Sequence, residues 1–144
     1  MPRTIPLALL TALLATPAPA QIVPPREGNE NLAPLFVQEG AIVDLIRLWS
    51  IDMNGDGTDE RFVQVAYAPA GGGNAWWLQF FVLPPEGQGD IPREVALDTA
   101  GIEEVSMTPD GPVAVTMHYA GDDGHCCPTL RDTASLRLRD LPPA

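Results

Sequence analysis

The chain has 144 residues and a formal net charge of −11, with 19 acidic residues against 8 basic ones, all arginine. Such a surface repels nucleic acid and anionic lipid and attracts cations, so it argues against a nucleic-acid partner. The length suits one domain that can bury a hydrophobic core.

Residues 1–20 have the pattern of a signal peptide. Arg3 precedes an apolar run from Ile5 to Leu14, and Ala18-Pro19-Ala20 provides the small residues of a cleavage site, which predicts a cut before Gln21. The run is shorter than the roughly 20 apolar residues that span a bilayer. We therefore expect a periplasmic or extracellular protein with no transmembrane segment after cleavage.

Residues 21–34 are rich in proline and poor in apolar residues, which predicts an irregular lead. Residues 35–144 then show short apolar runs separated by Gly, Pro and Asp, which indicates one all-β domain. The fold class expected is a single antiparallel β-sandwich or a curved meander. The predicted strands are Ala41–Ile51, Glu60–Ala68, Ala75–Leu83, Glu94–Leu97, Ile102–Met107, Val113–Tyr119 and Ala134–Arg139.

Three of these segments alternate with period two, as half-buried strands do. In the segment 60–68, one face carries Val63, Val65 and Tyr67. In the segment 113–119, one face carries Val113, Val115 and Met117, and His118 lies on the opposite, solvent side. In the segment 134–139, Leu136 and Leu138 alternate with polar residues. Ala41–Trp49 also has the spacing of an amphipathic helix, but its β-prone residues favour a strand.

An acidic segment, Asp52–Glu60, has the composition of a loop that surrounds a hard cation with oxygen atoms. Its acidic and amide side chains recur at every second position, and Gly57 permits a sharp bend. Calcium takes about 6–8 oxygen ligands, including carboxylates and carbonyls. The predicted calcium ligands are Asp52, Asn54, Asp56, Thr58 through its carbonyl, and Glu60. A solvated hairpin turn is the alternative.

The segment is not an EF-hand, because Val63 stands where the bidentate Glu should be and the flanks are predicted strands. It resembles the calcium loops of FG-GAP/VCBS-type repeats, which follow D-x-N-x-D-G-x-x-[DE] inside a β-hairpin. That resemblance implies a calcium site, but the chain holds one copy and cannot build a propeller by itself.

The adjacent residues Cys126 and Cys127 are the second unusual feature. Export implies an oxidising compartment, in which they can form a vicinal disulfide. Their Cα atoms would lie about 3.8 Å apart, below the usual 4.4–6.8 Å. The alternatives are a bridge to another chain, a soft-metal site with His125 and His118, or two buried, inert thiols.

This region resembles a group of exported bacterial proteins of unknown function that carry a Cys-Cys-Pro-[Ser/Thr] motif after a Gly-Asp segment. Here the matching residues are Gly121-Asp122 and Cys126-Cys127-Pro128-Thr129. Those proteins often have an aspartate-rich hairpin and an aromatic strand upstream. In this chain, Asp52–Glu60 corresponds to the hairpin and Trp76–Phe81 to the aromatic strand. The resemblance implies no known activity.

The function expected is an exported, calcium-stabilised β module with a non-enzymatic binding or structural role and no catalytic residues. The expected partner is a protein or a glycan. The aromatic segment Trp76–Phe81 is typical of a central strand that is buried on both sides, and an exposed aromatic platform for such a partner is the alternative. The first alternative is a redox or soft-metal protein that works through Cys126 and Cys127. A weaker alternative is a small hydrolase that uses Asp122, Asp123 and His125.

Overall fold

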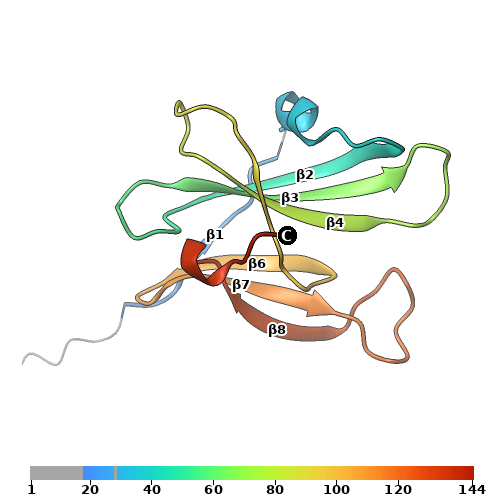
Figure 1. The fold of residues 1–144 in the computed structure, drawn as a ribbon. Helices are drawn as coiled ribbons and strands as arrows, with labels where there is room; N and C mark the ends of the chain where they lie inside the picture. The colour runs from blue at the N-terminus through green and yellow to red at the C-terminus, as the bar shows by residue number, and fades with distance from the viewer. Residues whose placement is uncertain (1–17, 28) are drawn as a thin grey trace, which may run out of the picture.

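The computed structural model describes residues 18–27 and 29–144, which form a sandwich of two antiparallel four-stranded sheets (Figure 1). This confirms the predicted fold class. One sheet has the order β1-β6-β7-β8 and the other β2-β3-β4-β5. The strands are β1 (Gln21–Val23), β2 (Ala41–Ile51), β3 (Glu60–Pro69), β4 (Trp77–Leu83), β5 (Arg93–Val95), β6 (Gly101–Thr108), β7 (Gly111–His118) and β8 (Leu130–Ser135).

The predicted signal peptide, residues 1–20, lies mostly outside the described residues. Residues 18–20 are exposed and immediately precede β1, so cleavage before Gln21 would leave that strand whole. No helix in residues 18–27 and 29–144 is long and apolar enough to cross a membrane.

The hairpin of β2 and β3 is the longest strand pair, and the acidic loop joins its strands. Its register runs from Ala41 opposite Pro69 to Ile51 opposite Glu60, with a bulge at Asp44. The segment 41–49 is therefore a strand and not a helix. Every residue from Glu60 to Tyr67 is buried, because β3 lies inside its sheet and is covered on both faces.

Two hydrophobic cores lie on the two faces of the β2-β3-β4-β5 sheet. The inner core fills the space between the sheets and consists of Trp49, Ile51, Met53, Phe62, Phe80, Val82, Val95, Ile102, Val105, Ala114, Leu136 and Leu141. The outer core lies beneath a 3-10 helix, η1 (Glu30–Phe36), and consists of Leu32, Phe36, Ile46, Leu48, Val63, Val65, Tyr67, Phe81 and Leu83. One sheet thus contributes to both cores.

The lead, residues 21–34, is more regular than the sequence predicts. It contains β1, which pairs with β6, and most of η1. Between them the Arg26 N–H donates to the Leu48 carbonyl at 2.6 Å. Leu32 explains the difference, because its side chain packs with Phe36, just after the lead, into the outer core of the sheet.

The last strand lies earlier in the chain than the prediction of 134–139. β8 is Leu130–Ser135, and Leu138–Asp140 forms a 3-10 helix, η2. β8 is an edge strand whose first four residues are exposed, so it has no apolar alternation to reveal it. Leu136 is buried beyond the strand, where its N–H donates to the Pro112 carbonyl at 2.9 Å.

The two faces of β7 are reversed relative to the prediction. Ala114 and Thr116 are buried in the interior, whereas Val113 and Val115 are only half-buried on the other face. The facing sheet fills the inner core with the large rings of Trp49, Phe62 and Phe80, so small side chains fit opposite them. His118 is half-buried, and its Nε2 lies 3.1 Å from the Thr116 hydroxyl.

Candidate functional site

The acidic loop forms the tip of the β2–β3 hairpin (Figure 1), and its base is buried in the sandwich. Met53 is 2% exposed and belongs to the inner core, and Glu60 is 6% exposed. The Met53 carbonyl accepts the Leu138 N–H at 3.0 Å, which joins the loop to η2. The hairpin tip is therefore anchored at both of its ends.

The Asp52 carboxylate turns into the loop and accepts backbone hydrogen bonds. Oδ1 accepts from Gly55 at 2.7 Å and from Asp56 at 3.2 Å, and Oδ2 accepts from Gly57 at 2.8 Å. Gly55 and Gly57 have φ of 82° and 86°, a region that glycine enters without strain. The predicted bend at Gly57 is thus what directs an N–H toward Asp52.

Asn54 joins two acidic side chains that repel each other. Its Nδ2 donates to Asp56 Oδ2 at 2.9 Å and to Glu60 Oε1 at 2.7 Å, while its Oδ1 accepts the Asp56 N–H at 2.8 Å. The Thr58 N–H donates to Asp56 Oδ1 at 2.8 Å. This bond, followed by that from Asn54, lowers the pKa of Asp56 below its ordinary value.

Glu60 is the buried carboxylate of the loop. Its Oε2 accepts the Met53 N–H at 2.8 Å, and its Oε1 accepts from Asn54. Within residues 18–27 and 29–144, no arginine or histidine forms an ion pair with it, nor with Asp52 or Asp56. A buried carboxylate is costly without a charge partner, so neutral donors alone compensate Glu60.

The donor set of the loop is oxygen-rich and suits a hard cation such as calcium. The Asn54 side chain joins those of Asp56 and Glu60, whereas the Asp52 carboxylate contacts the backbone N–H groups of the loop. Thr58 is exposed and donates its N–H to Asp56. In the part of the chain that the structure describes, no three His, Cys, Asp or Glu side chains are grouped closely enough to hold a metal ion. Calcium coordination would require the Asn54 amide to turn its nitrogen away from the two carboxylates.

A groove beside the loop is bounded by the β6–β7 turn and by residues 137–139. The Arg137 side chain lies across Gly111, so that a Cβ atom placed on this glycine would come within 2.7 Å of Arg137 Nε. Gly111 has a φ of 112°. The turn is therefore shaped to accept the Arg137 side chain.

The two cysteines form a disulfide with each other, as the primary prediction for them states. Their Cα atoms are 3.8 Å apart, and both residues are exposed in the loop between β7 and β8. The described residues thus show an intramolecular bond in place of the three alternatives, which were a bridge to another chain, a soft-metal site and two buried thiols.

The loop around the disulfide is organised by Asp123. Its Oδ2 accepts the N–H groups of Ala120 at 2.7 Å and Thr129 at 2.8 Å, and its Oδ1 accepts the Thr129 hydroxyl at 2.9 Å. These bonds, the one from Ala120 first, lower the pKa of Asp123. In residues 18–27 and 29–144, no hydrogen bond links the His125 ring to Asp122 or Asp123, so the hydrolase alternative gains no geometric support.

The aromatic segment divides between core and surface. Phe80 and Phe81 are buried on opposite faces of β4, as expected of a strand covered on both sides. Trp76 is 64% exposed and Trp77 is 36% exposed, and the Trp77 ring stacks on Tyr67 with ring centroids 5.5 Å apart. Only the start of the segment can therefore meet a partner.

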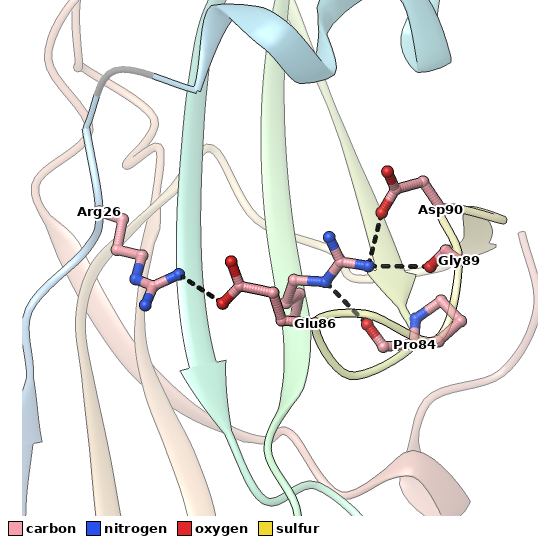
Figure 2. Close-up of polar contacts among 6 residues, drawn as sticks. Arg26, Pro84, Glu86, Gly89 and Asp90 are labelled. Atoms are coloured by element: carbon pink, nitrogen blue, oxygen red, sulfur yellow. Dashed lines mark hydrogen bonds and ion pairs between the residues drawn. The ribbon is translucent and has the colours of Figure 1, made fainter.

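Arg61 has a structural role that the sequence analysis missed. Its Nε donates to the Pro84 carbonyl at 2.7 Å, and its Nη2 donates to the Gly89 carbonyl at 3.0 Å and pairs with Asp90 at 2.7 Å (Figure 2). The side chain is 8% exposed. The available signal for a buried anchor was a single arginine within a strand that is mostly apolar apart from Glu60 and Gln64.

Comparison of the chain with models of protein families gave no match, and comparisons with curated proteins and with solved structures gave none either. The two sequence resemblances therefore remain predictions.

Proposed function

We propose that this protein is an exported, calcium-stabilised β-sandwich with a non-enzymatic binding or structural role. The observation that carries the proposal is Glu60, a buried carboxylate in an acidic loop that no basic side chain of the described residues neutralises. A divalent ion among Asp52, Asn54, Asp56 and Glu60 would supply the missing positive charge.

Calcium would act on the fold through the hairpin that carries its ligands. The loop connects β2 to β3, and these strands contribute to both hydrophobic cores. An ion that binds the folded loop and not the unfolded chain stabilises the protein by mass action. The stabilisation is about 2.7 kcal/mol when free calcium is one hundred times the dissociation constant.

Calorimetry of the protein with calcium and with a chelator tests the proposal. We expect calcium to raise the melting temperature, and Asp56→Ala to remove this increase. Asp98→Asn is the control, because Asp98 is an exposed acid in the segment between β5 and β6. Equal melting of the wild-type protein in calcium and in chelator would refute the proposal.

The binding role is supported by two exposed aromatic side chains: Trp76, which precedes β4, and Trp77, its first residue. Exposed aromatic rings commonly stack on sugars or pack against protein partners. Titration with a glycan library, followed by tryptophan fluorescence, tests this role, and Trp76→Ala should abolish any response. Binding that survives Trp76→Ala unchanged would place the partner elsewhere.

A further inference from the structure

The disulfide of the β7–β8 loop encloses almost no chain. The loop projects beyond the ends of β7 and β8 (Figure 1), and the bonded cysteines are consecutive residues. In the chain-entropy account, a disulfide stabilises a fold more as it encloses more residues. A bridge between neighbours therefore contributes little to global stability, and stabilisation of the fold does not account for it.

Hydrogen bonds close this loop without help from the sulfur atoms. Asp123 joins Ala120 to Thr129 across the base of the loop. Nearer the tip, the Tyr119 hydroxyl donates to the His125 carbonyl at 2.6 Å, and the Cys127 N–H donates to the Gly124 carbonyl at 3.0 Å. The loop can therefore keep its shape when the disulfide opens.

The sulfur atoms are accessible to a dissolved thiol. Both cysteines are exposed, and a Cβ atom at Gly124 would lie 3.9 Å from Cys126 Sγ, so the glycine leaves that side of the sulfur uncovered. Thiol–disulfide exchange requires a thiolate to reach one of the two sulfur atoms. Exposed disulfides are the ones that serve as labile, regulatory or catalytic bonds.

We propose that Cys126–Cys127 is a reversible redox site that exchanges electrons with a dithiol. A thiolate of the dithiol attacks one cysteine sulfur, the S–S bond breaks, and the other cysteine leaves as a thiolate that takes up a proton. The second thiol of the reductant then attacks the mixed disulfide and releases the first cysteine. Two electrons and two protons pass to the protein, and the dithiol becomes a disulfide.

Reduction of the native protein with dithiothreitol, without oxygen or denaturant, tests the proposal. After the reaction is quenched with iodoacetamide, the intact mass should show both cysteines alkylated, and the melting temperature of the reduced protein should equal that of the oxidised one. Oxidised dithiothreitol should restore the intramolecular bond. Reduction that occurs only on unfolding, that lowers the melting temperature, or that is followed by reoxidation into dimers would each overturn the proposal.

Two aspartates in the loop provide a matched pair of variants. Asp123 carries the hydrogen bonds that shape the loop, whereas no hydrogen bond of the exposed Asp122 side chain occurs in the described residues. Adjacent cysteines in a freely moving chain rarely have disulfide geometry. Asp123→Asn should therefore shift the exchange equilibrium several-fold toward the dithiol, and Asp122→Asn should not; equal shifts would contradict the positioning role of Asp123.

The double substitution Cys126→Ser with Cys127→Ser separates the redox role from stability. We expect the double variant to melt at the wild-type temperature and to take up no iodoacetamide after treatment with dithiothreitol. A large loss of stability in this variant would show that the bridge is structural, and it would overturn the proposal.

Discussion

The fold opposes the ionisation of Tyr67. This side chain is fully buried beneath η1, and its hydroxyl donates to the Phe36 carbonyl at 3.0 Å. Burial, assisted by the negative charge of Glu94, raises its pKa to about 12 from an ordinary value of 10.0. The folded protein therefore retains a proton that the unfolded chain releases more readily.

This difference predicts a loss of stability at high pH. Stability should be unaffected by Tyr67 below pH 10 and should fall as the pH rises toward about 12, because only the unfolded chain ionises in that window. The loss attributable to Tyr67 is on the order of 2 kcal/mol. Urea unfolding measured across this pH range in wild type and in Tyr67→Phe is the appropriate experiment.

In Tyr67→Phe the decline over this range should be reduced, although the variant is less stable at neutral pH by roughly 1 kcal/mol for the lost hydrogen bond. Tyr119→Phe is the control, because Tyr119 is 50% exposed and is the other tyrosine of the chain. If both variants declined with pH as steeply as the wild type, another group would be responsible.

At the scale of elements, Arg61 connects β3 to the loop of residues 84–90. Arg61→Ala should destabilise the protein by about 2–3 kcal/mol, since hydrogen bonds of a charged group contribute about 1.5–3 kcal/mol. Much of the charge on Asp90 remains solvated after the substitution, because its side chain is 50% exposed. Arg61→Lys should recover only part of the loss, because an ammonium group lacks the planar fork that reaches several acceptors. Denaturant unfolding measures all three proteins.

The exposed ion pair between Arg26 and Glu86, also drawn in Figure 2, is the control for this prediction. The ion pair between Arg26 and Glu86 spans 3.5 Å, and its side chains are 56% and 79% exposed. Exposed pairs contribute about 0–1 kcal/mol. Arg26→Ala should therefore change stability little; a loss as large as that of Arg61→Ala would mean that burial is not the cause.

The turn between β6 and β7 yields a prediction from backbone conformation. Gly111 combines a φ of 112° with close approach of the Arg137 side chain, so Gly111→Ala introduces both backbone strain and a clash. We expect a loss of about 1–3 kcal/mol. Gly121→Ala is the matched control, since a Cβ atom there meets nothing within 4 Å. Thermal melting of the two variants should differ accordingly, and equal melting would contradict this account.

Strands were predictable from the sequence where an apolar run ends at turn-forming residues. Ala41–Ile51 was predicted with the bounds that the structure gives it, because apolar residues and the loop at Asp52 mark it. β8 was not, since a polar edge strand is held by its neighbour rather than by apolar side chains. Which face of β7 points inward also depends on the aromatic rings of the facing sheet that pack with Ala114, and the local sequence of β7 carries no information about those rings.

The candidate sites were predictable to different degrees. The calcium site that the spacing of Asp52, Asn54 and Asp56 predicts stays a prediction, whereas the adjacency of Cys126 and Cys127 suggested the bond that they form. The burial of Glu60 follows from its place at the start of a central strand, which the alternation did not reveal. The role of Asp123 depends on contacts across a hairpin loop.

For the whole molecule, the decisive feature is one sheet that lies between two cores. Phe36 covers its outer face, where the Phe36 and Phe81 ring centroids are 4.8 Å apart, and Trp49 belongs to the inner face at 1% exposure. β2, β3 and β4 supply side chains to both cores, so neither core can come apart without disturbing a shared strand. We therefore expect the two cores to unfold in one transition.

Phe36→Ala tests this cooperativity. Truncation of a buried phenylalanine costs about 3–5 kcal/mol, and the loss should appear in the fluorescence of Trp49, which lies in the other core. Because Trp76 and Trp77 also fluoresce, the measurement uses a background in which both are phenylalanine. Val37→Ala is the control, since Val37 is 77% exposed. A Trp49 transition that stayed at its original midpoint would show that the η1 layer unfolds separately from the inner core.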